Sequence, residues 1–402
     1  MNTSPAPVAT TAAVEFRDVD ILFGDDPATA LERLDAGATR AEVLETTGQV
    51  IGVAGASMAI AEGEICVLMG LSGSGKSTLL RAVNGLNQVT RGQVLVKDGD
   101  TTVDVAACDP ATLRRLRSNR VAMVFQQFAL LPWRTVRENV GLGLELRGMD
   151  KSEIGRVVDE KLELVHLDKW ADKFAHELSG GMQQRVGLAR AFATDAEILL
   201  MDEPFSALDP LIRTHLQEEL LELQSALRKT IVFVSHDLDE ALKIGRRIAI
   251  MEEGRIVQLG EPEQIVLDPA NEYVADFVAH MNPLNVLRGG SLMRPVEDLA
   301  RKDDRVVLDA QGYYEVALDA GGVPRSAWCD GRPVPLSHAA PEAPVDEQIV
   351  GLPVSVLMRE AVETLHHTGS PVLLMEDDRM VGVIGQAEIY RGILRQSELG
   401  QS

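Results

Sequence analysis

The 402-residue sequence has only three cysteines, and no two of them form a Cys-x-x-Cys pair. This excludes a disulfide framework and a cysteine-based zinc cluster, and it favours a reducing compartment. No uncharged stretch supplies the roughly 18 apolar residues that cross a bilayer, and the longest one, residues 46–61, is rich in Gly, Ser and Thr. Met1–Val14 lacks the basic residues and apolar run of a secretory signal. We therefore expect a soluble chain of the cytoplasm.

Basic residues are also in deficit, with 39 Lys and Arg against 61 Asp and Glu, a formal net charge of −22. Nucleic-acid binding requires clustered basic residues that neutralise phosphates, and the sequence has no basic block. Nucleic acid is therefore not expected as a partner, and the acidic surface is interpreted as solubilising. The length suggests two or three domains and a large core that needs no disulfides.

Short apolar runs alternate with amphipathic patterns through the first two thirds of the chain. Glu64–Met69, Ile198–Met201 and Thr230–Val234 have the length of buried strands, whereas Ile154–Leu167 and Leu211–Leu227 show helical spacing. Unbroken apolar strands between amphipathic helices predict an α/β fold with a parallel sheet covered on both faces.

The N-terminal part is expected to be less regular. Residues 1–13 are rich in Ala, Thr and Pro and are predicted to be disordered. Val14–Leu22 alternates loosely, as an edge strand would. Residues 25–47 are predicted to form a helical insertion, because their apolar residues recur at loosely helical spacing.

A glycine-rich loop follows the first buried run and precedes a predicted helix at Ser77–Gly85. Its residues are Gly70, Leu71, Ser72, Gly73, Ser74, Gly75, Lys76 and Ser77, and Thr78 follows. Such a loop turns successive backbone N–H groups toward phosphate oxygens. Lys76 is expected to reach the terminal phosphates and the Ser77 hydroxyl to ligate Mg²⁺, as in a P-loop. A purely structural glycine turn is the alternative.

The apolar run Ile198–Met201 ends in two carboxylates, Asp202 and Glu203. Ligands bind at the carboxyl ends of parallel strands. We therefore predict that Asp202 holds the metal, directly or through water, and that Glu203 orients or deprotonates a water beside the γ-phosphate. Without the P-loop upstream, a solvated strand end would be the better interpretation.

A second anion site is predicted where another helix begins. Ser179 is a good N-cap, and Gly180 and Gly181 leave backbone amides exposed. A single nucleotide bound to one chain would not need two separate phosphate-binding sites. Two chains meeting head-to-tail would explain both, because each cradle would close the P-loop site of the other chain.

With these motifs the chain resembles the ABC ATPases, the nucleotide-binding subunits of ATP-binding-cassette transporters, over about residues 14–285. The resemblance implies a P-loop NTPase fold with a parallel-sheet core and a helical subdomain. It also implies ATP and Mg²⁺ as ligands and a homodimer in which Ser179, Gly180 and Gly181 act in trans. Met182 stands where many members have glutamine.

The resemblance assigns further residues. Gln126 matches the glutamine that reaches Mg²⁺ and the attacking water, and His236 matches the histidine that contacts the γ-phosphate. Asp209, in Ser206-Ala207-Leu208-Asp209, matches the loop that crosses the dimer interface. Phe23 is the candidate for stacking on adenine, with core packing as the alternative.

Three features indicate an importer subunit. The motif set occurs once, no membrane-spanning segment is fused to it, and the loop after Gln126 is rich in large apolar side chains. Exposed aromatics there suggest a socket for a partner's helix, and in the family this region receives a coupling helix. The expected contacts with an integral-membrane permease are Phe128, Leu130, Leu131 and Trp133, with core packing as the alternative. The chain would then lie peripherally on the cytoplasmic face of the inner membrane.

Other segments resemble the quaternary-amine branch of the importers, which takes up glycine betaine, proline betaine and choline. Residues 23–27, 126–136, 208–213 and 236–242 carry this similarity, and Asn282–Leu287 favours the choline-type members. The resemblance implies ATP-driven uptake of choline or glycine betaine, delivered by a periplasmic or surface solute-binding protein. A free-standing ABC ATPase with a regulatory or nucleic-acid-maintenance role is the alternative.

Residues 286–402 are predicted to form a separate accessory region. Arg288–Val345, rich in Gly and Pro, is expected to be irregular. Val354–Leu394 predicts a helix, a hairpin around Asp377-Asp378-Arg379 and a second helix from Gln386 to Leu394. This order resembles a single CBS motif at about residues 350–396, where members of the branch often carry two. The region is interpreted either as a sensor of adenine nucleotide or ionic strength, or as a dimer-stabilising appendage.

Overall fold

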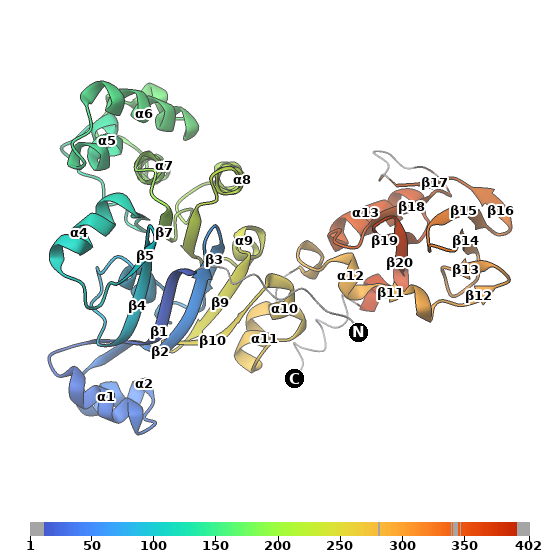
Figure 1. Cartoon of the computed structure of the whole chain (residues 1–402), viewed down its shortest axis with the longest axis horizontal. Coiled ribbons are helices and arrows are strands. Elements are labelled where there is room, and N and C mark those ends of the chain that lie inside the picture. The colour runs from blue at the N-terminus through green and yellow to red at the C-terminus, as the bar shows by residue number, and fades with distance from the viewer. Residues whose placement is uncertain (1–11, 280–281, 339, 341–344, 346, 392–402) are drawn as a thin grey trace. The chain divides into compact units, whose positions relative to one another are not determined.

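Figure 1 shows the computed structural model of the chain, which describes all residues except 1–11, 280–281, 339, 341–344, 346 and 392–402. The chain divides into two compact units between Glu261 and Pro262. Within the described residues, no helix combines the length and the apolar character that crossing a bilayer requires.

A mostly parallel sheet forms the centre of the first unit. Its strands lie side by side in the order β10 (Arg255–Gly260), β9 (Arg247–Glu252), β3 (Ile65–Met69), β8 (Thr230–Val234), β7 (Ile198–Asp202) and β6 (Val121–Val124). Only the β10–β9 pair of this sheet is antiparallel. Every residue of β3, β7 and β8 is buried, as expected for strands covered on both faces. The predicted parallel-sheet fold is confirmed.

Helices follow the strands of this sheet and also form a layer of their own. Helix α8 (Pro210–Leu227) connects β7 to β8 and α9 (Leu238–Ile244) connects β8 to β9, whereas α3 (Lys76–Ala82) follows β3 and α4 (Pro110–Asn119) precedes β6. Three others pack against one another, namely α5 (Val136–Leu146), α6 (Lys151–Leu164) and α7 (Gly180–Ala193), drawn in green in Figure 1. The predicted helices are present, and α6 begins three residues early because the Asp150 carboxylate caps it by accepting from Ser152 N.

A second, antiparallel sheet was not expected from the sequence. Its strands run in the order β2 (Val50–Ala61), β1 (Ala12–Phe23), β4 (Arg91–Asp98) and β5 (Thr101–Asp104). Because β1 pairs with both β2 and β4, the prediction of an edge strand at Val14–Leu22 is wrong. Residues 1–13 were predicted to be disordered, but residues 12 and 13 belong to β1. Residues 1–11 lie outside the described part of the chain.

The helical insertion is confirmed as two helices between β1 and β2. These are α1 (Pro27–Asp35) and α2 (Arg40–Thr47). Asp26 caps α1, and Thr39 forms a reciprocal capping box with Glu42 at the start of α2. Leu34 and Val43 are buried, so the insertion packs on the body of the first unit through its own small core.

The second unit begins with α10 (Pro262–Leu267), α11 (Glu272–Val278) and α12 (Gly289–Leu292). The segment predicted to be irregular contains an antiparallel sheet of short strands, namely β12 (Arg301–Lys302), β13 (Arg305–Val307), β14 (Tyr314–Leu318), β15 (Pro324–Cys329) and β16 (Arg332–Val334). That prediction is wrong. Strands of two to six residues, separated by positive-φ turns such as Gly322 and Gly331, are too short to show a period in the sequence.

The last part of the second unit follows the predicted order. It contains β18 (Ile349–Pro353), α13 (Met358–Thr368), β19 (Val372–Glu376) and β20 (Arg379–Ile384). The three strands share a sheet with β11 (Arg294–Pro295) and β17 (Leu336–Ser337). The hairpin turns at Asp377 and Asp378, both at positive φ. The second helix begins at Gln386, and its predicted end at Leu394 lies outside the described residues.

Candidate active site

The glycine-rich loop connects β3 to α3, and two of its positions admit only glycine. Gly70 and Gly75 have φ angles of 138° and 102°. A Cβ atom at Gly70 would lie 2.1 Å from the Met251 carbonyl oxygen, and one at Gly75 would lie 2.4 Å from the Gly52 carbonyl oxygen. The loop is therefore closely packed against two neighbouring segments, and its curvature is fixed by the fold.

Lys76, the first residue of α3, turns back onto this loop. Its Nζ donates to the carbonyl oxygens of Gly70 and Leu71, at 2.8 and 2.9 Å. Burial lowers the pKa of Lys76, whereas the negative charges of Glu203 and Asp202 oppose that shift. The ammonium group is thus held at the loop, close to two carboxylates that favour its charged form.

Ser77 and Asp202 form a pair of oxygen donors next to the loop. The Ser77 hydroxyl donates to Asp202 Oδ1 at 2.6 Å, and Arg81 Nη2 contacts Oδ2 at 2.8 Å. Hydroxyl and carboxylate oxygens are the hard ligands that Mg²⁺ prefers, so this pair fits that ion. Sequence analysis missed Arg81, although its place one turn after Ser77 on the same face of α3 was a usable signal.

The side chains predicted for water activation meet at the carboxyl ends of three adjacent strands. Glu203 follows β7, Gln126 follows β6 and His236 follows β8. Glu203 Oε2 accepts from Gln126 Nε2 at 3.0 Å and lies 3.3 Å from His236 Nδ1. The carboxylate is 17% exposed. One carboxylate therefore lies between an amide and an imidazole, at the edge where parallel strands bind ligands.

Glu203 has a left-handed backbone, with φ 49°. This conformation is unfavourable for a residue with a Cβ, and surrounding contacts must hold it. Its N–H donates to the Val234 carbonyl oxygen at 3.1 Å, and its own carbonyl accepts from Gln184 Nε2 at 3.2 Å. Gln184, buried in α7, also accepts from Ala207 N. Sequence analysis missed this link, because nothing in the pattern marks one glutamine of a helix as a bridge.

A cavity of about 530 Å³ connects these groups, within the usual range for small-molecule sites. Its lining includes Phe23, Ser72, Gly73, Gly75, Lys76, Ser77, Thr78, Gln126, Glu203 and His236. Phe23 is 43% exposed, so an aromatic face is available there. Arg40 of the insertion also lines the cavity and donates to the Gly73 carbonyl oxygen at 2.7 Å. Sequence analysis missed Arg40, because only tertiary packing brings α2 to the loop.

The second predicted anion site is separate from this cavity. Ser179 Oγ accepts from Met182 N at 3.4 Å and thereby caps α7, while Asp209 caps α8 by accepting from Ile212 N. Ser179, Gly180 and Asp209 are exposed, and they are absent from the described lining of the cavity, as is Gly181. Within one chain, the structure does not bring these residues to the P-loop.

The loop after Gln126 presents one large aromatic side chain. Trp133 is 70% exposed, whereas Phe128, Leu130 and Leu131 are half-buried. The loop is held from beneath, because Asn139, fully buried in α5, exchanges hydrogen bonds with the backbone of Leu131. Of the four expected contact residues, Trp133 is the one that is mostly in solvent.

Comparison with known proteins places these features in a family. The model of the ABC transporter family matches residues 53–206. The glycine betaine/proline betaine transport system ATP-binding protein ProV of Escherichia coli is 40% identical over 95% of this chain and 98% of its own length. The glycine betaine transport ATP-binding protein OpuAA of Bacillus subtilis is 38% identical, over 96% of this chain and 93% of its own.

A solved structure agrees with these relatives. The dimeric structure of MJ0796, a bacterial ABC transporter cassette, is 29% identical, covers 62% of this chain and 98% of its own, and has a TM-score of 0.54. The P-loop, the strand-end carboxylates and the helix capped by Ser179 thus occur in a chain that is similar to transport ATP-binding proteins along nearly its full length. The chain belongs to the ABC transporter family, as one of its ATP-binding subunits.

Proposed function

We propose that this chain binds ATP with Mg²⁺ in the cavity beside the P-loop and hydrolyses it to drive uptake of a quaternary amine. The observation that carries the proposal is the Glu203 carboxylate, which lies between Gln126 and His236 and lines the same cavity as Lys76. A base positioned beside a phosphate cradle is what hydrolysis of a terminal phosphate requires.

The hydrogen bonds of the P-loop residues support the roles that we propose for them. Backbone N–H groups from Gly70 to Thr78 would hold the phosphates, and Lys76 would exchange its two carbonyl acceptors for terminal phosphate oxygens. Ser77, Asp202 and Gln126 would hold Mg²⁺, which neutralises phosphate charge when bound. Arg81 Nη2 already contacts Asp202 Oδ2, and this ion pair keeps the carboxylate aligned beside Ser77.

Water activation is assigned to Glu203. Its Oε2 would accept the proton of the attacking water while Gln126 keeps the carboxylate oriented. His236 would contact the γ-phosphate from the end of β8. Phe23, exposed at the cavity, is the proposed stacking partner of the adenine ring.

A head-to-tail homodimer is proposed to complete each site. Ser179, Gly180, Gly181 and Asp209 lie outside the cavity of their own chain, yet Ser179 and Gly180 present an exposed helix start that suits a phosphate. The structural relative MJ0796 is described as a dimeric cassette and also in a post-hydrolysis state with ADP and Pi. These residues would therefore act on the nucleotide of the partner chain.

Membrane permease subunits are the proposed transport partners, with the chain held peripherally on the cytoplasmic face of the inner membrane. Trp133, with Phe128, Leu130 and Leu131 behind it, is the proposed contact for a permease helix. A periplasmic or surface binding protein would deliver the solute. Relatives are named for glycine betaine, proline betaine and trimethylamine N-oxide, so a quaternary amine of this class, choline or glycine betaine, is the proposed cargo.

Residues 14–285 are proposed as the ATPase domain and 286–402 as an accessory region with one CBS-like motif. A direct test of the partners is co-purification from detergent-solubilised membranes with a tagged chain. Multi-spanning permease subunits should co-purify with the wild type, and Trp133→Ala should reduce their yield. Recovery of the chain without any membrane protein would contradict the proposal. Trp170→Ala, at another partly exposed tryptophan, is the control.

A further inference from the structure

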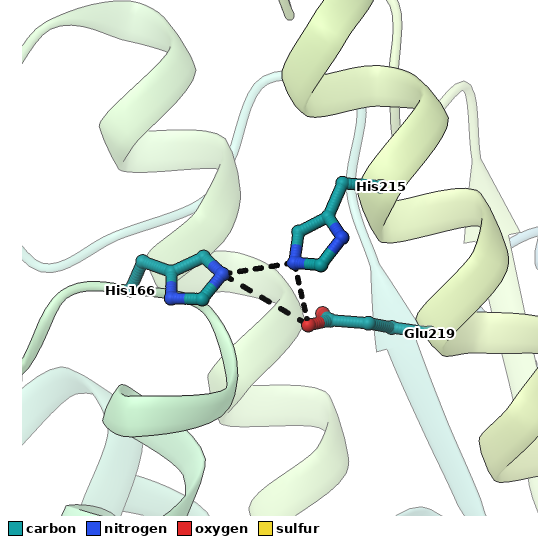
Figure 2. A group of neighbouring side chains, drawn as sticks. All are labelled: His166, His215 and Glu219. Atoms are coloured by element: carbon teal, nitrogen blue, oxygen red, sulfur yellow. Dashed lines mark hydrogen bonds and ion pairs between the residues drawn. The ribbon is translucent and has the colours of Figure 1, made fainter.

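Two histidines and a glutamate meet in the first unit outside the described lining of the candidate active site. His166 follows α6, and His215 and Glu219 lie one turn apart on α8 (Figure 2). The two Nε2 atoms are 2.9 Å apart, and Glu219 Oε1 lies 3.0 Å from His215 Nε2 and 4.0 Å from His166 Nε2. Three potential ligand atoms therefore surround one point.

The local structure explains why these side chains converge. Residues four apart share one face of a helix, which places His215 beside Glu219. His166 has a left-handed backbone, φ 54°, just after the C-cap of α6. The carbonyl of the preceding residue, Val165, accepts from Arg185 Nη1 of α7 at 3.1 Å. The backbone that carries His166 is thus held by a neighbouring helix.

The distances suit a tetrahedral metal ion. With bonds of about 2.0–2.1 Å, the ligands of tetrahedral Zn²⁺ lie about 3.3 Å apart. The observed separations of 2.9, 3.0 and 4.0 Å lie on both sides of that value. A hydrogen bond between the rings requires one Nε2 to be a donor and the other an acceptor. Ion pairs of Glu219 with both rings require both histidines to be protonated, and then neither Nε2 could accept.

We propose that His166, His215 and Glu219 form a binding site for a borderline divalent transition-metal ion of the zinc class, with the fourth position open to water. Two imidazole nitrogens and a carboxylate are a donor set that suits Zn²⁺ better than Mg²⁺ or Ca²⁺. His166 and His215 are 57% and 47% exposed, so an ion can reach their nitrogens.

The Glu219 side chain is 20% exposed, so an ion beside it would replace part of the hydration that burial removes. A bound dication would stabilise the ionised carboxylate. The ion would also connect the segment after α6 to α8. Arg185 already links that segment to α7. The site would therefore restrain the helix that begins after Ser179 relative to the helix that begins after Asp209.

Metal titration of the full chain, stripped with EDTA, tests the site directly. Zn²⁺ affinity is measured by competition with a chromophoric chelator, and Co²⁺ is used as a spectroscopic substitute. We expect one tightly bound ion per chain and the intense visible absorption of tetrahedral Co²⁺. Each of His166→Ala, His215→Ala and Glu219→Gln should weaken Zn²⁺ binding at least about tenfold.

Controls separate this site from other histidines. His366→Ala, in a second histidine pair, and His236→Ala, beside Glu203, should keep the wild-type Zn²⁺ affinity. Zn²⁺ should raise the melting temperature of the wild type and leave that of the His166→Ala/His215→Ala double variant unchanged, while the metal-free proteins melt alike. If the double variant binds Zn²⁺ as tightly as the wild type, or the wild type binds no ion, the proposal is overturned.

Discussion

At the scale of single residues, the proposed hydrolytic chemistry depends on Glu203. Its backbone is strained at φ 49°, yet hydrogen bonds and an ion pair hold the residue in place, with the partners Gln126, His236, Gln184, Val234 and Ser206. Strain that the surroundings hold in this way is typical of functional positions. The carboxylate is therefore positioned before any nucleotide binds.

Glu203→Gln should reduce ATP turnover about 10²–10⁴-fold, because the only change is the loss of the proton acceptor. ATP affinity should stay near that of the wild type, since the phosphate cradle is untouched. Turnover is measured by phosphate release and affinity by equilibrium titration. Glu153→Gln, on the exposed start of α6, is the matched control. Normal turnover by Glu203→Gln would remove Glu203 from the mechanism.

Lys76→Ala tests a different step from Glu203→Gln. It removes the positive charge that faces the terminal phosphates, so ATP affinity itself should fall at least about tenfold. Equilibrium titration with ATP and with AMP separates the contribution of the terminal phosphates to affinity from that of the rest of the nucleotide. The loss should be large for ATP and small for AMP, which lacks the phosphates that Lys76 is expected to reach. Unchanged ATP affinity would contradict the proposed role.

The thiol of Cys66 should be inert in the folded chain. Burial raises its pKa to about 12, and the residue is fully buried in β3. Because the folded pKa lies above the usual 9.0, its contribution to stability is full below about pH 9 and is lost as the pH rises toward 12. At pH 8, a disulfide reagent should modify the partly exposed Cys108 first, and Cys66 only after unfolding. Rapid reaction of Cys66 without unfolding would contradict its burial.

At the scale of elements, the sequence predicted the strands that carry the site and missed much of what supports them. The runs that became β7 and β8 were predicted as strands, and parallel strands end at one edge, so the meeting of Glu203 and His236 could be predicted. Gln126 follows β6, which was not predicted, and its place came only from the family resemblance. The N-terminal sheet could not be predicted, because Val50–Ala61 is interrupted by small and polar residues that hide its period. Strand β1 pairs with β2 on one side and with β4 on the other. The alternation of Val14–Leu22 does not reveal that the strand has two neighbours.

Contacts between elements that lie far apart in the chain could not be predicted from the sequence pattern either. Arg40 reaches the P-loop only because the insertion folds onto β2, and Gln184 bridges two loops from a buried helix face. Both depend on tertiary packing rather than on local spacing. They are polar groups whose partners lie far away in the chain.

Gln184→Leu tests the bridge between α7 and these loops. The substitution leaves the Ala207 N–H without its acceptor and removes one donor from the Glu203 carbonyl. We expect the free energy of unfolding to fall by about 1–3 kcal/mol, and turnover to fall with it, because Glu203 loses part of its support. Urea denaturation and phosphate release provide the two measurements. The exposed Gln88→Leu should change neither, and an equal effect there would remove the special role of Gln184.

At the scale of the whole molecule, the proposed mechanism places residues of two chains at each nucleotide. Ser179→Arg should stop hydrolysis although Ser179 lies outside the cavity of its own chain, because a long side chain blocks the approach of the α7 amides to the partner's γ-phosphate. ATP affinity of the monomer should barely change. Ser225→Arg, exposed on α8, should hydrolyse normally. Wild-type turnover by Ser179→Arg would refute the head-to-tail arrangement.

ATP-driven solute uptake by the assembled transporter is the most direct measurement of the proposed function. Proteoliposomes that contain the co-purified permease subunits and this chain, with ATP and Mg²⁺ on its side of the membrane, are supplied with binding protein and radiolabelled glycine betaine or choline. We expect ATP-dependent accumulation of at least one of these solutes, and we expect it to disappear with Glu203→Gln. Steady hydrolysis of ATP by the wild-type complex, with no uptake of either quaternary amine, would contradict the proposed function.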